Sequence, residues 1–560
     1  TRRAMAIALQ GVLDWAERYA RAAARAAEVE PDPATRACLR RIADACSHVP
    51  SQPARTLFEA LQAIALVHLA TAIEGHGMSI SIGLPDRILE RFVPAEDTWD
   101  EAWELIAAFF LKITANSVFG RGSKTQPITI GGADHTGADR SNGLTRLFLE
   151  ACNRIRVGDP PVFLRWHPNL PEDIRRQAAD MLARGVSMPL LINDAPTARG
   201  FEEAGVASED AWEYCVIGCN ELGIPGRSAE SATAFGGTIQ YLEMLNRVLL
   251  DLPDPDRVPD METLLEHLRG HMRDRALRMR RNGQKHRRRM AECVPTPFTS
   301  SLMRGCPARG KDMLTGMQYH LPGTYERGLS NAANALAAIE HTVFETGTKP
   351  LSAIVETVRS DHADPALREL LRAGPRWGTD DERADRWACR LIEMREEILA
   401  EVDRIVGSEP HMVCHVVRSL HWLDGRRIGA SPDGRKAGEP VSDSIGAEMG
   451  TGAGGPTGIL NSVLKIDAAR HYRGGYNLNL TLPASDTTPE GVLALVETFF
   501  ERGGQELQIN CLDPNVLRDA RKHPERHGDL VVRVAGFSVR FVDLAPGEQD
   551  ELIRRAENAA

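Results

Sequence analysis

The hydrophobic pattern predicts amphipathic helices in several long stretches of the chain. Ala4–Ala27 is rich in Ala and Arg and contains no Pro, a composition with high helix propensity. Thr56–Ala72 and Trp99–Ala115 repeat apolar residues at the three- and four-residue spacing of a helix face. Arg273–Arg289 is helical in pattern but strongly basic, and we interpret it as a solvated helix face rather than a patch that binds nucleic acid.

Short apolar runs bounded by Gly, Pro or polar residues lie between these helical stretches and predict strands. The predicted strands are Met78–Gly83, Pro127–Gly131, Val162–Trp166, Leu190–Asn193, Val216–Gly218, Gly475–Leu482, Leu507–Cys511 and Leu530–Val534. Their alternation with helices favours an α/β fold. Gly429–Gly458 is rich in Gly, Ser, Pro and Asp and is predicted to be a long loop.

Composition narrows the class of protein. The 560 residues carry 67 Lys and Arg against 77 Asp and Glu, a net charge of −10, so the chain lacks the basic character of a general nucleic-acid binder. No run approaches the roughly 18 uninterrupted apolar residues of a membrane span. Ten scattered Cys give no disulfide framework, and we expect a reducing cytoplasm. We expect no bound metal ion, because no His pair is accompanied by a cluster of carboxylates.

One segment carries a candidate for hydrogen or proton transfer. An apolar run leads to Cys219 at a glycine-flanked turn, and Glu221 follows two residues later. In an extended segment these two side chains would project to the same side and share one cavity. A carboxylate beside a sulfur suits a general base, although a Cys after an apolar strand is more often inert core.

A second segment near the C-terminus is a β-rich run broken by glycine. Leu530–Leu544 is interrupted by Gly536, next to Phe537 and Ser538. A glycine inside a strand marks a bulge or a place where another group approaches the backbone closely.

Together the two segments resemble the glycyl radical enzymes related to pyruvate formate-lyase. The resemblance rests on Cys219-Asn220-Glu221, on Arg533-Val-Ala-Gly536-Phe-Ser, and on further motifs in the family's order. These motifs are Pro53–Gln62, Gly77–Gly83, Thr129–Gly132, Met188–Asp194, Gly328–Ile339, Gly429–Pro440, Gly455–Val463 and Leu517–Glu525. Members of the family are longer before the position of Thr1, so we expect either a fragment or a member of a shorter subgroup.

The resemblance implies a fold and a set of roles. The fold would be a ten-stranded α/β barrel of two antiparallel five-stranded halves, surrounded by helices, with the Cys loop and the Gly loop meeting inside. Residues 1–425 would form the barrel domain and 426–560 the glycine radical domain. Gly536 would store the radical, Cys219 would become a transient thiyl radical, and Glu221 would act as a base. No cofactor would stay bound, because a separate radical-SAM activating enzyme installs the radical with S-adenosylmethionine. A homodimer is expected.

The Cys-x-Glu pattern bears on the reaction. It argues against acyl transfer, whose members carry two adjacent cysteines, and favours elimination of water, amine or sulfite from a small polar substrate. A radical decarboxylase, a C–C cleaving enzyme like formate C-acetyltransferase, and a catalytically silent scaffold relative remain alternatives.

The general acid and the substrate contacts are less clear in the sequence. Diol-dehydratase relatives carry an Asp close to where this chain has Thr233, so the acid that would protonate the leaving group is not assigned. Four residues are candidates for contacting substrate: Asn220, Asn193, His76 and Arg435. For Arg435 a turn-stabilising role is favoured, and for Asn193 and His76 a structural role competes.

Overall fold

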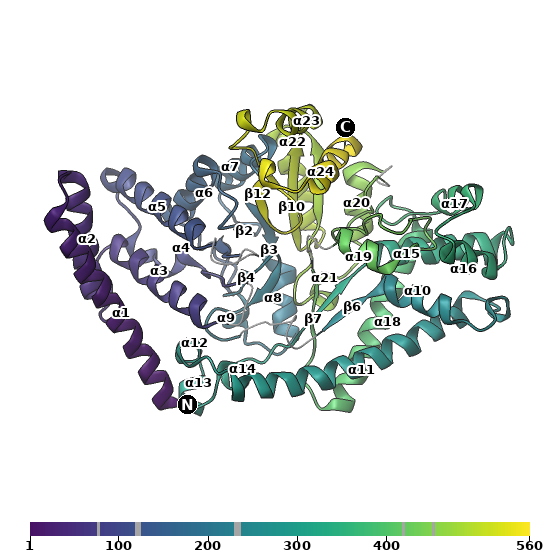
Figure 1. Ribbon diagram of the computed structural model, residues 1–560, viewed down its shortest axis with the longest axis horizontal. Helices are drawn as coiled ribbons and strands as arrows, with labels where there is room; N and C mark the ends of the chain where they lie inside the picture. The colour runs from purple at the N-terminus through teal and green to yellow at the C-terminus, as the bar shows by residue number, and fades with distance from the viewer. Residues whose placement is uncertain (76–78, 118–124, 229–236, 417–420, 451–453, 560) are drawn as a thin grey trace.

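The computed structural model describes residues 1–75, 79–117, 125–228, 237–416, 421–450 and 454–559. Its strands are β1 Ile128–Gly131, β2 Val162–Trp166, β3 Leu190–Asn193, β4 Cys215–Ile217, β5 Glu221–Gly223, β6 Thr238–Gln240, β7 Gly323–Arg327, β8 Met412–His415, β9 Asn479–Pro483, β10 Glu506–Leu512, β11 Val531–Arg533 and β12 Ser538–Arg540. These strands lie at the centre of the molecule and helices lie around them (Figure 1). The prediction of an α/β fold is confirmed.

The central strands form two sheets. In the larger sheet the order is β1-β2-β3-β10-β9: β1, β2 and β3 are parallel, and β10 runs antiparallel to β3 and parallel to β9. The smaller sheet contains the parallel strands β6, β7 and β8. A parallel bridge between His415, at the end of β8, and Tyr476 links the smaller sheet to the segment before β9. One ten-stranded barrel was expected from the sequence, whereas the described residues form these two separate sheets.

The larger sheet contains strands from both predicted regions, residues 1–425 and 426–560. Strands β1 to β3 come from the first region, and β9 and β10 come from the second. Leu164 of β2, Leu191 of β3 and Ile509 of β10 belong to the same hydrophobic core. The two regions therefore share one sheet and one core.

Most predicted strands are found within one to four residues of their expected bounds. Val162–Trp166 and Leu190–Asn193 have the predicted bounds, since both are apolar runs buried on both faces. Of the predicted strand 78–83, Met78 lies outside the described residues. Residues 79–83 do not form a strand but lie alongside β1 and the residues before it, with parallel bridges from Ser79 to Thr125 and from Gly83 to Ile128. The strands β5 to β8 and β12 were not predicted, because they are short and partly polar.

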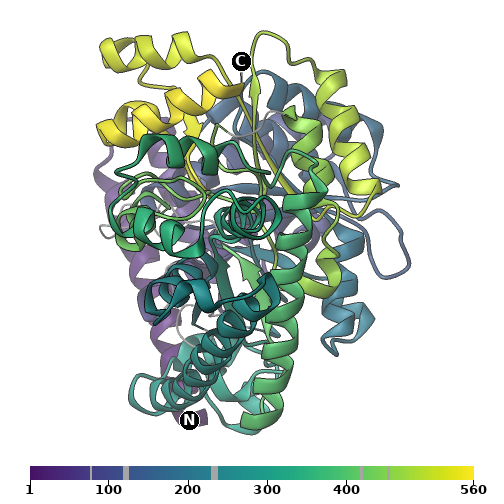
Figure 2. The same cartoon turned by 90° about the vertical axis from the view of Figure 1, so that its right-hand side faces the viewer.

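The helices that cover the sheets come from every part of the chain. The longer helices are α1 Arg2–Val29, α2 Pro33–His48, α3 Leu57–Glu74, α5 Trp99–Ser117, α6 Gly143–Ile155, α7 Glu172–Ala183, α10 Tyr241–Asp251, α11 Met261–Cys293, α15 Leu329–Ile339, α18 Glu382–Val406, α22 Pro489–Glu501 and α24 Pro546–Ala559. Helix α15 is buried along its whole length, and its Ala-rich sequence lets neighbours approach closely. Figures 1 and 2 show the N-terminus and α24 at opposite ends of the molecule.

The basic segment 273–289 lies within α11 and is paired with α18. Arg273 binds Glu401 at 2.7 Å, and the buried Arg280 binds Asp403 at 2.9 Å. These arginines therefore face acidic residues of a neighbouring helix. The prediction of a solvated helix face holds only for other residues of the segment 273–289.

Helix α3 is long and apolar enough to cross a membrane, judged by length and composition alone. Within the fold Leu61 belongs to the main core, and Leu66 packs with Ala16, Ala20 and Cys46 of α1 and α2. A core helix of a soluble protein passes the same criterion, so this feature is weak evidence for a membrane span.

Candidate active site

Cys219 lies at the tip of a β-hairpin. Strands β4 and β5 pair antiparallel with Ile217 opposite Glu221, which leaves Gly218, Cys219 and Asn220 as the connecting turn. The segment is therefore a tight turn at Cys219 and not the extended chain that the sequence suggested. Gly218 adopts a φ of +69°, a conformation that glycine adopts without strain.

The side chain of Glu221 folds back over this turn. Its Oε2 accepts hydrogen bonds from the backbone N–H of Cys219 at 3.0 Å and of Asn220 at 3.3 Å. Its Oε1 accepts a hydrogen bond from the hydroxyl of Tyr325 on β7. A Cβ on Gly218 would lie 2.5 Å from Glu221 Oε2, so the carboxylate occupies the space that glycine leaves. Cys219 and Glu221 thus share one small region, but the turn rather than strand alternation brings them together.

Two neighbouring segments hold the hairpin in place. Asn220 is fully buried, and its Nδ2 donates to the His415 carbonyl at 2.9 Å on β8. Gly475 has a φ of +100°, and a Cβ there would lie 2.3 Å from the Asn220 carbonyl oxygen. The backbone N–H of Leu222 donates to the Gly474 carbonyl at 3.2 Å. The Cys219 turn is therefore packed directly against the backbone of β8 and of the segment at Gly474 and Gly475.

Gly536 lies at the tip of a second hairpin. Strands β11 and β12 pair antiparallel, and the Val534 N–H donates to the Phe537 carbonyl at 3.0 Å, so Ala535 and Gly536 form the turn. Gly536 is buried and has a φ of +85°, which disfavours any residue with a Cβ. Arg555 of α24 donates to the Val534 carbonyl at 2.7 Å and fixes the turn from outside.

Strand β10 carries a row of polar side chains toward this hairpin. Glu506, Gln508 and Asn510 alternate with three residues of the main core, Leu507, Ile509 and Cys511. Asn510 Nδ2 donates to the Arg533 carbonyl at 3.1 Å, and Arg533 Nε donates to Gln508 Oε1 at 2.8 Å. The polar face of β10 therefore positions the strand that leads to Gly536.

Arg533 connects this hairpin electrostatically with the Cys219 turn. Burial lowers the pKa of Arg533 to about 10, and the influence of Cys219 and Glu506 opposes that shift. Cys219 and Glu506 are thus close enough to act on the guanidinium charge. Arg533 stands three residues before Gly536, on the strand that leads to the Gly536 turn.

Glu506 and Tyr325 are functional candidates that the sequence analysis missed. Glu506 is fully buried, and burial raises its pKa well above the usual value, with Glu221 adding to the shift. The alternation Glu506-Leu-Gln-Ile-Asn510 in an otherwise apolar strand was a signal of an inward polar face. Tyr325 gave no such signal, because Gly323–Arg327 lacks an apolar pattern.

The remaining candidates for substrate contact have structural partners. Asn193 Nδ2 donates to the carbonyls of Phe500 at 2.9 Å and Gly504 at 2.8 Å, and so joins β3 to the turn before β10. The Asn220 side chain likewise donates a hydrogen bond to a backbone carbonyl, that of His415 on β8. His76 lies outside the described residues, as does Thr233. The structure therefore brings Asn220 to the Cys219 turn and gives Asn193 a role between strands.

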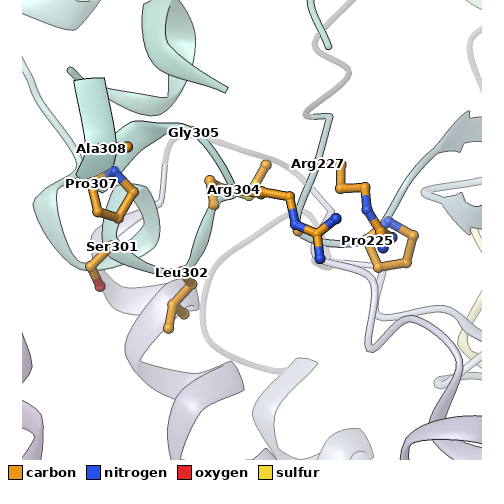
Figure 3. Close-up of a pocket in the computed structure, with 10 residues that line it drawn as sticks. Pro225, Arg227, Ser301, Leu302, Arg304, Gly305, Pro307 and Ala308 are labelled. Carbon is orange, nitrogen blue, oxygen red and sulfur yellow. The ribbon is translucent and has the colours of Figure 1, made fainter. Parts of the chain in front are cut away.

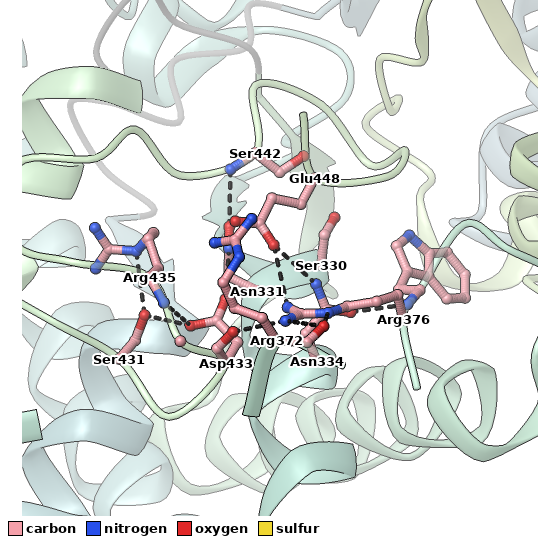
Figure 4. A network of polar contacts seen from close by, with 12 residues as sticks. Ser330, Asn331, Asn334, Arg372, Arg376, Ser431, Asp433, Arg435, Ser442 and Glu448 are labelled. Atoms are coloured by element: carbon pink, nitrogen blue, oxygen red, sulfur yellow. Dashed lines mark hydrogen bonds and ion pairs between the residues drawn. The ribbon is translucent and has the colours of Figure 1, made fainter. Parts of the chain in front are cut away.

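Arg435 lies in a buried polar network of the loop around Ser431–Glu448. Its Nε donates to Ser431 Oγ at 3.1 Å, its Nη1 donates to the Glu439 carbonyl at 2.7 Å, and its Nη2 donates to the Gly429 carbonyl. Figure 4 shows this network extending through Asp433 to side chains of α15. All three guanidinium nitrogens bind groups of the loop itself, which fits the turn-stabilising interpretation rather than a contact with substrate.

A pocket of about 520 Å³ lies beyond the Cys219 hairpin. It is lined by Pro225–Arg227, which follow β5, and by residues around α12 (Pro297–Leu302) and α13 (Cys306–Arg309). Figure 3 shows Arg304 extending toward Pro225 and Arg227. This pocket contains neither Cys219 nor Gly536, so we do not assign the chemistry to it. Among the described residues, no group of three or more His, Cys, Asp or Glu could hold a metal ion.

Comparisons with known proteins define the family. A family model described as pyruvate formate lyase-like matches residues 2–420, and a model described as glycine radical matches residues 441–542. Together they cover most of the chain, so the protein belongs to the pyruvate formate-lyase-like family and is a glycyl radical enzyme.

Individual relatives narrow the class further. The chain is 28% identical to (2S)-3-sulfopropanediol dehydratase of Klebsiella oxytoca over 99% of its own length and 71% of the relative's. It is 27% identical to isethionate sulfite-lyase of Oleidesulfovibrio alaskensis, over 100% of its own length and 72% of the relative's. The glycerol-bound structure of the B12-independent glycerol dehydratase from Clostridium butyricum superimposes with a TM-score of 0.90 at 25% identity, over 97% of this chain and 72% of that one. The chain is therefore a glycyl radical lyase of the dehydratase and eliminase type, with the α/β fold of the glycerol dehydratase.

Proposed function

We propose that Gly536 stores the radical, that Cys219 carries it to the substrate as a thiyl radical, and that Glu221 is the base. The observation that supports this assignment is the position of Arg533, whose charge is influenced by Cys219 and whose backbone, bound by Asn510, leads to Gly536. A Cα radical at Gly536 is stabilised by the flanking amides, and the missing Cβ leaves room for the sulfur to approach.

The reaction then follows in balanced steps. The Gly536 radical takes the hydrogen atom of the Cys219 thiol, and the thiyl radical takes a hydrogen atom from the substrate carbon that bears a hydroxyl group. Glu221 accepts the proton of that hydroxyl, and the leaving group on the adjacent carbon departs with the electron pair of its bond. The product radical regains a hydrogen atom from Cys219, and the sulfur regains one from Gly536.

The wider architecture is inferred to be one ten-stranded barrel of two antiparallel five-stranded halves. The antiparallel pairing of β3 and β10 supports a junction between the halves. The parallel bridges at His415 and Tyr476, and at Gly83 and Ile128, support further strand-like neighbours at the edges of the two sheets. Residues 1–425 would supply most of this barrel, and 426–560 would supply the glycine radical domain. A closed interior would keep water and oxygen from the radicals.

Partners and location follow from the chemistry. A separate radical-SAM activating enzyme would remove the hydrogen atom from Gly536 with S-adenosylmethionine. The radical is oxygen-sensitive, which suits an anaerobic cytoplasm, and a homodimer is expected from the family resemblance. The substrate would be a small polar molecule.

Anaerobic EPR spectroscopy tests this proposal. The full chain is incubated with an activating enzyme, S-adenosylmethionine and a reductant, and the wild type is compared with Gly536→Ala. We expect a glycyl doublet in the wild type and none in the variant. Absence of the doublet in the wild type, with an activating enzyme that works on another relative, would overturn the proposal. The activated protein is then assayed on compounds that the relatives process: glycerol, propane-1,2-diol, 3-sulfopropanediol, trans-4-hydroxyproline and isethionate.

A further inference from the structure

Elimination of a hydroxyl group needs an acid, because hydroxide is a poor leaving group unless it is protonated. The sequence left this acid unassigned. Glu506, on the polar face of β10, carries a carboxyl group that has no role in the proposed mechanism. The inference below rests on that proposed function.

The geometry around Glu506 leaves one oxygen free. The residue is 0% exposed, and its Oε1 accepts a hydrogen bond from Gln508 Nε2 at 2.7 Å. Its Oε2 is buried and has no hydrogen-bond partner among the described residues. No ion pair joins Glu506 to Arg533 in the part of the chain that the structure describes; Gln508 lies between them and binds both.

The orientation of Gln508 decides which oxygen of Glu506 carries a proton. Arg533 Nε can only donate a hydrogen bond, so it takes the amide oxygen of Gln508. The amide NH₂ of Gln508 must then point to Glu506 and donate to Oε1. Because Oε1 acts as an acceptor, Oε2 is the position for the O–H of a neutral carboxyl group.

The electrostatic environment agrees with a neutral Glu506. Burial raises the pKa of Glu506 well above its ordinary value, and the nearby Glu221 carboxylate adds to the shift, whereas Gln508 and Arg533 oppose it. Two carboxyl groups with different environments commonly divide the acid and base roles. Here Glu221 is half-buried and Glu506 is fully buried.

We propose that Glu506 is the acid that protonates the leaving group, so that the substrate is a small molecule that loses a hydroxyl group as water. The C–O bond breaks with its electron pair on oxygen, and that oxygen takes the proton from Glu506 Oε2. Glu221 has accepted the proton of the neighbouring hydroxyl, so a proton transfer from Glu221 to Glu506 restores both groups. Substrate is converted to product and water without a further reactant.

The test compares activated wild type with Glu506→Gln and Glu506→Asp. Gln has nearly the same shape as Glu but supplies no acidic proton. We expect Glu506→Gln to keep the full glycyl doublet and to lose turnover of a substrate that releases water by about 100-fold or more, the usual contribution of a general acid. Glu506→Asp keeps the acid and should retain more activity than Glu506→Gln. Glu448→Gln, which removes another buried carboxyl group with a raised pKa, is the matched control and should retain turnover.

The outcomes separate this inference from the proposed function. Turnover of Glu506→Gln within about threefold of wild type would overturn the role of Glu506 and leave the radical chemistry intact. A radical-bearing wild type that dehydrates none of glycerol, propane-1,2-diol, 3-sulfopropanediol and trans-4-hydroxyproline but releases sulfite from isethionate, or that converts none of the five, would overturn the substrate class. Failure to form the glycyl doublet would instead contradict the proposed function itself.

Discussion

The carboxylate of Glu221 is hydrogen-bonded to the backbone of Cys219, with 3.0 Å between Oε2 and the amide nitrogen. The proposed base and the proposed hydrogen-atom carrier are therefore fixed to each other within one hairpin turn. Preorganisation of this kind reduces the entropic cost of bringing reacting groups together.

Replacement of the Cys219 sulfur should separate radical storage from turnover. We expect Cys219→Ser to form the glycyl doublet at the wild-type level and to lose turnover by more than about 1000-fold, because an O–H bond is too strong for reversible hydrogen exchange with Gly536 and substrate. Cys215→Ser is the matched control, since Cys215 is buried four residues earlier and Ser81 Oγ, which donates to its sulfur at 3.6 Å, can donate to a serine hydroxyl in the same place. Full turnover by Cys219→Ser would contradict the assignment.

Tyr325 should act as a positioning residue for Glu221. Tyr325→Phe removes the hydroxyl that donates to Glu221 Oε1. A hydrogen bond to a charged group contributes about 1.5–3 kcal/mol, so we expect kcat to fall roughly 10- to 100-fold while the doublet is unchanged. Tyr319→Phe, whose hydroxyl binds Asp210 at 2.7 Å, serves as the control. If both Tyr variants lose activity equally, Tyr325 has no special part in holding the base.

Gln508 should matter for transfer between Gly536 and Cys219. Gln508→Leu removes the acceptor of Arg533 Nε and leaves a buried guanidinium with one partner fewer. A displacement of the hairpin of about 1 Å is enough to reduce turnover about 100-fold. We expect a normal doublet with strongly reduced kcat, measured by EPR and product formation on the same sample. The control is Gln318→Leu, at a part-buried amide that binds Asp210; a normal kcat for Gln508→Leu would show that the anchor is dispensable.

Glu448 should make the stability of the protein depend on pH. Burial, with Asp433 adding to it, raises the pKa of Glu448 to about 7 from 4.5. Between these values the folded state holds a proton that the unfolded state has lost, so the stabilisation is fully present below about pH 4.5 and is lost as the pH rises through about 7. The linked change is on the order of 3 kcal/mol. Urea unfolding at pH 5 and pH 8 measures it, and Glu448→Gln should flatten the difference; an unchanged pH dependence in that variant would assign it to other groups.

Local sequence patterns were sufficient where the structure depends on short-range forces. The helices α1, α3 and α5 follow the apolar spacing within a few residues, and β2 and β3 follow two continuous apolar runs. The strands β5 to β8 could not be predicted, because their stability comes from pairing with distant strands and from burial on the sheet. The same reason explains why Tyr325 was not recognised.

The family and the pairing of Cys219, Glu221 and Gly536 as candidates could be read from the chain alone, since they depend on residue types in a short, ordered pattern. Tertiary structure decided which side chains are buried and which groups they contact. Glu506 belongs to an alternating polar row in the sequence, and only the fold buries it, raises its pKa and places Gln508 between it and Arg533. Arg435 shows the opposite case, because folding directs its guanidinium to the carbonyls of its own loop. Burial and long-range contacts set the pKa and the partners of a side chain, and neither is encoded in the residues next to it.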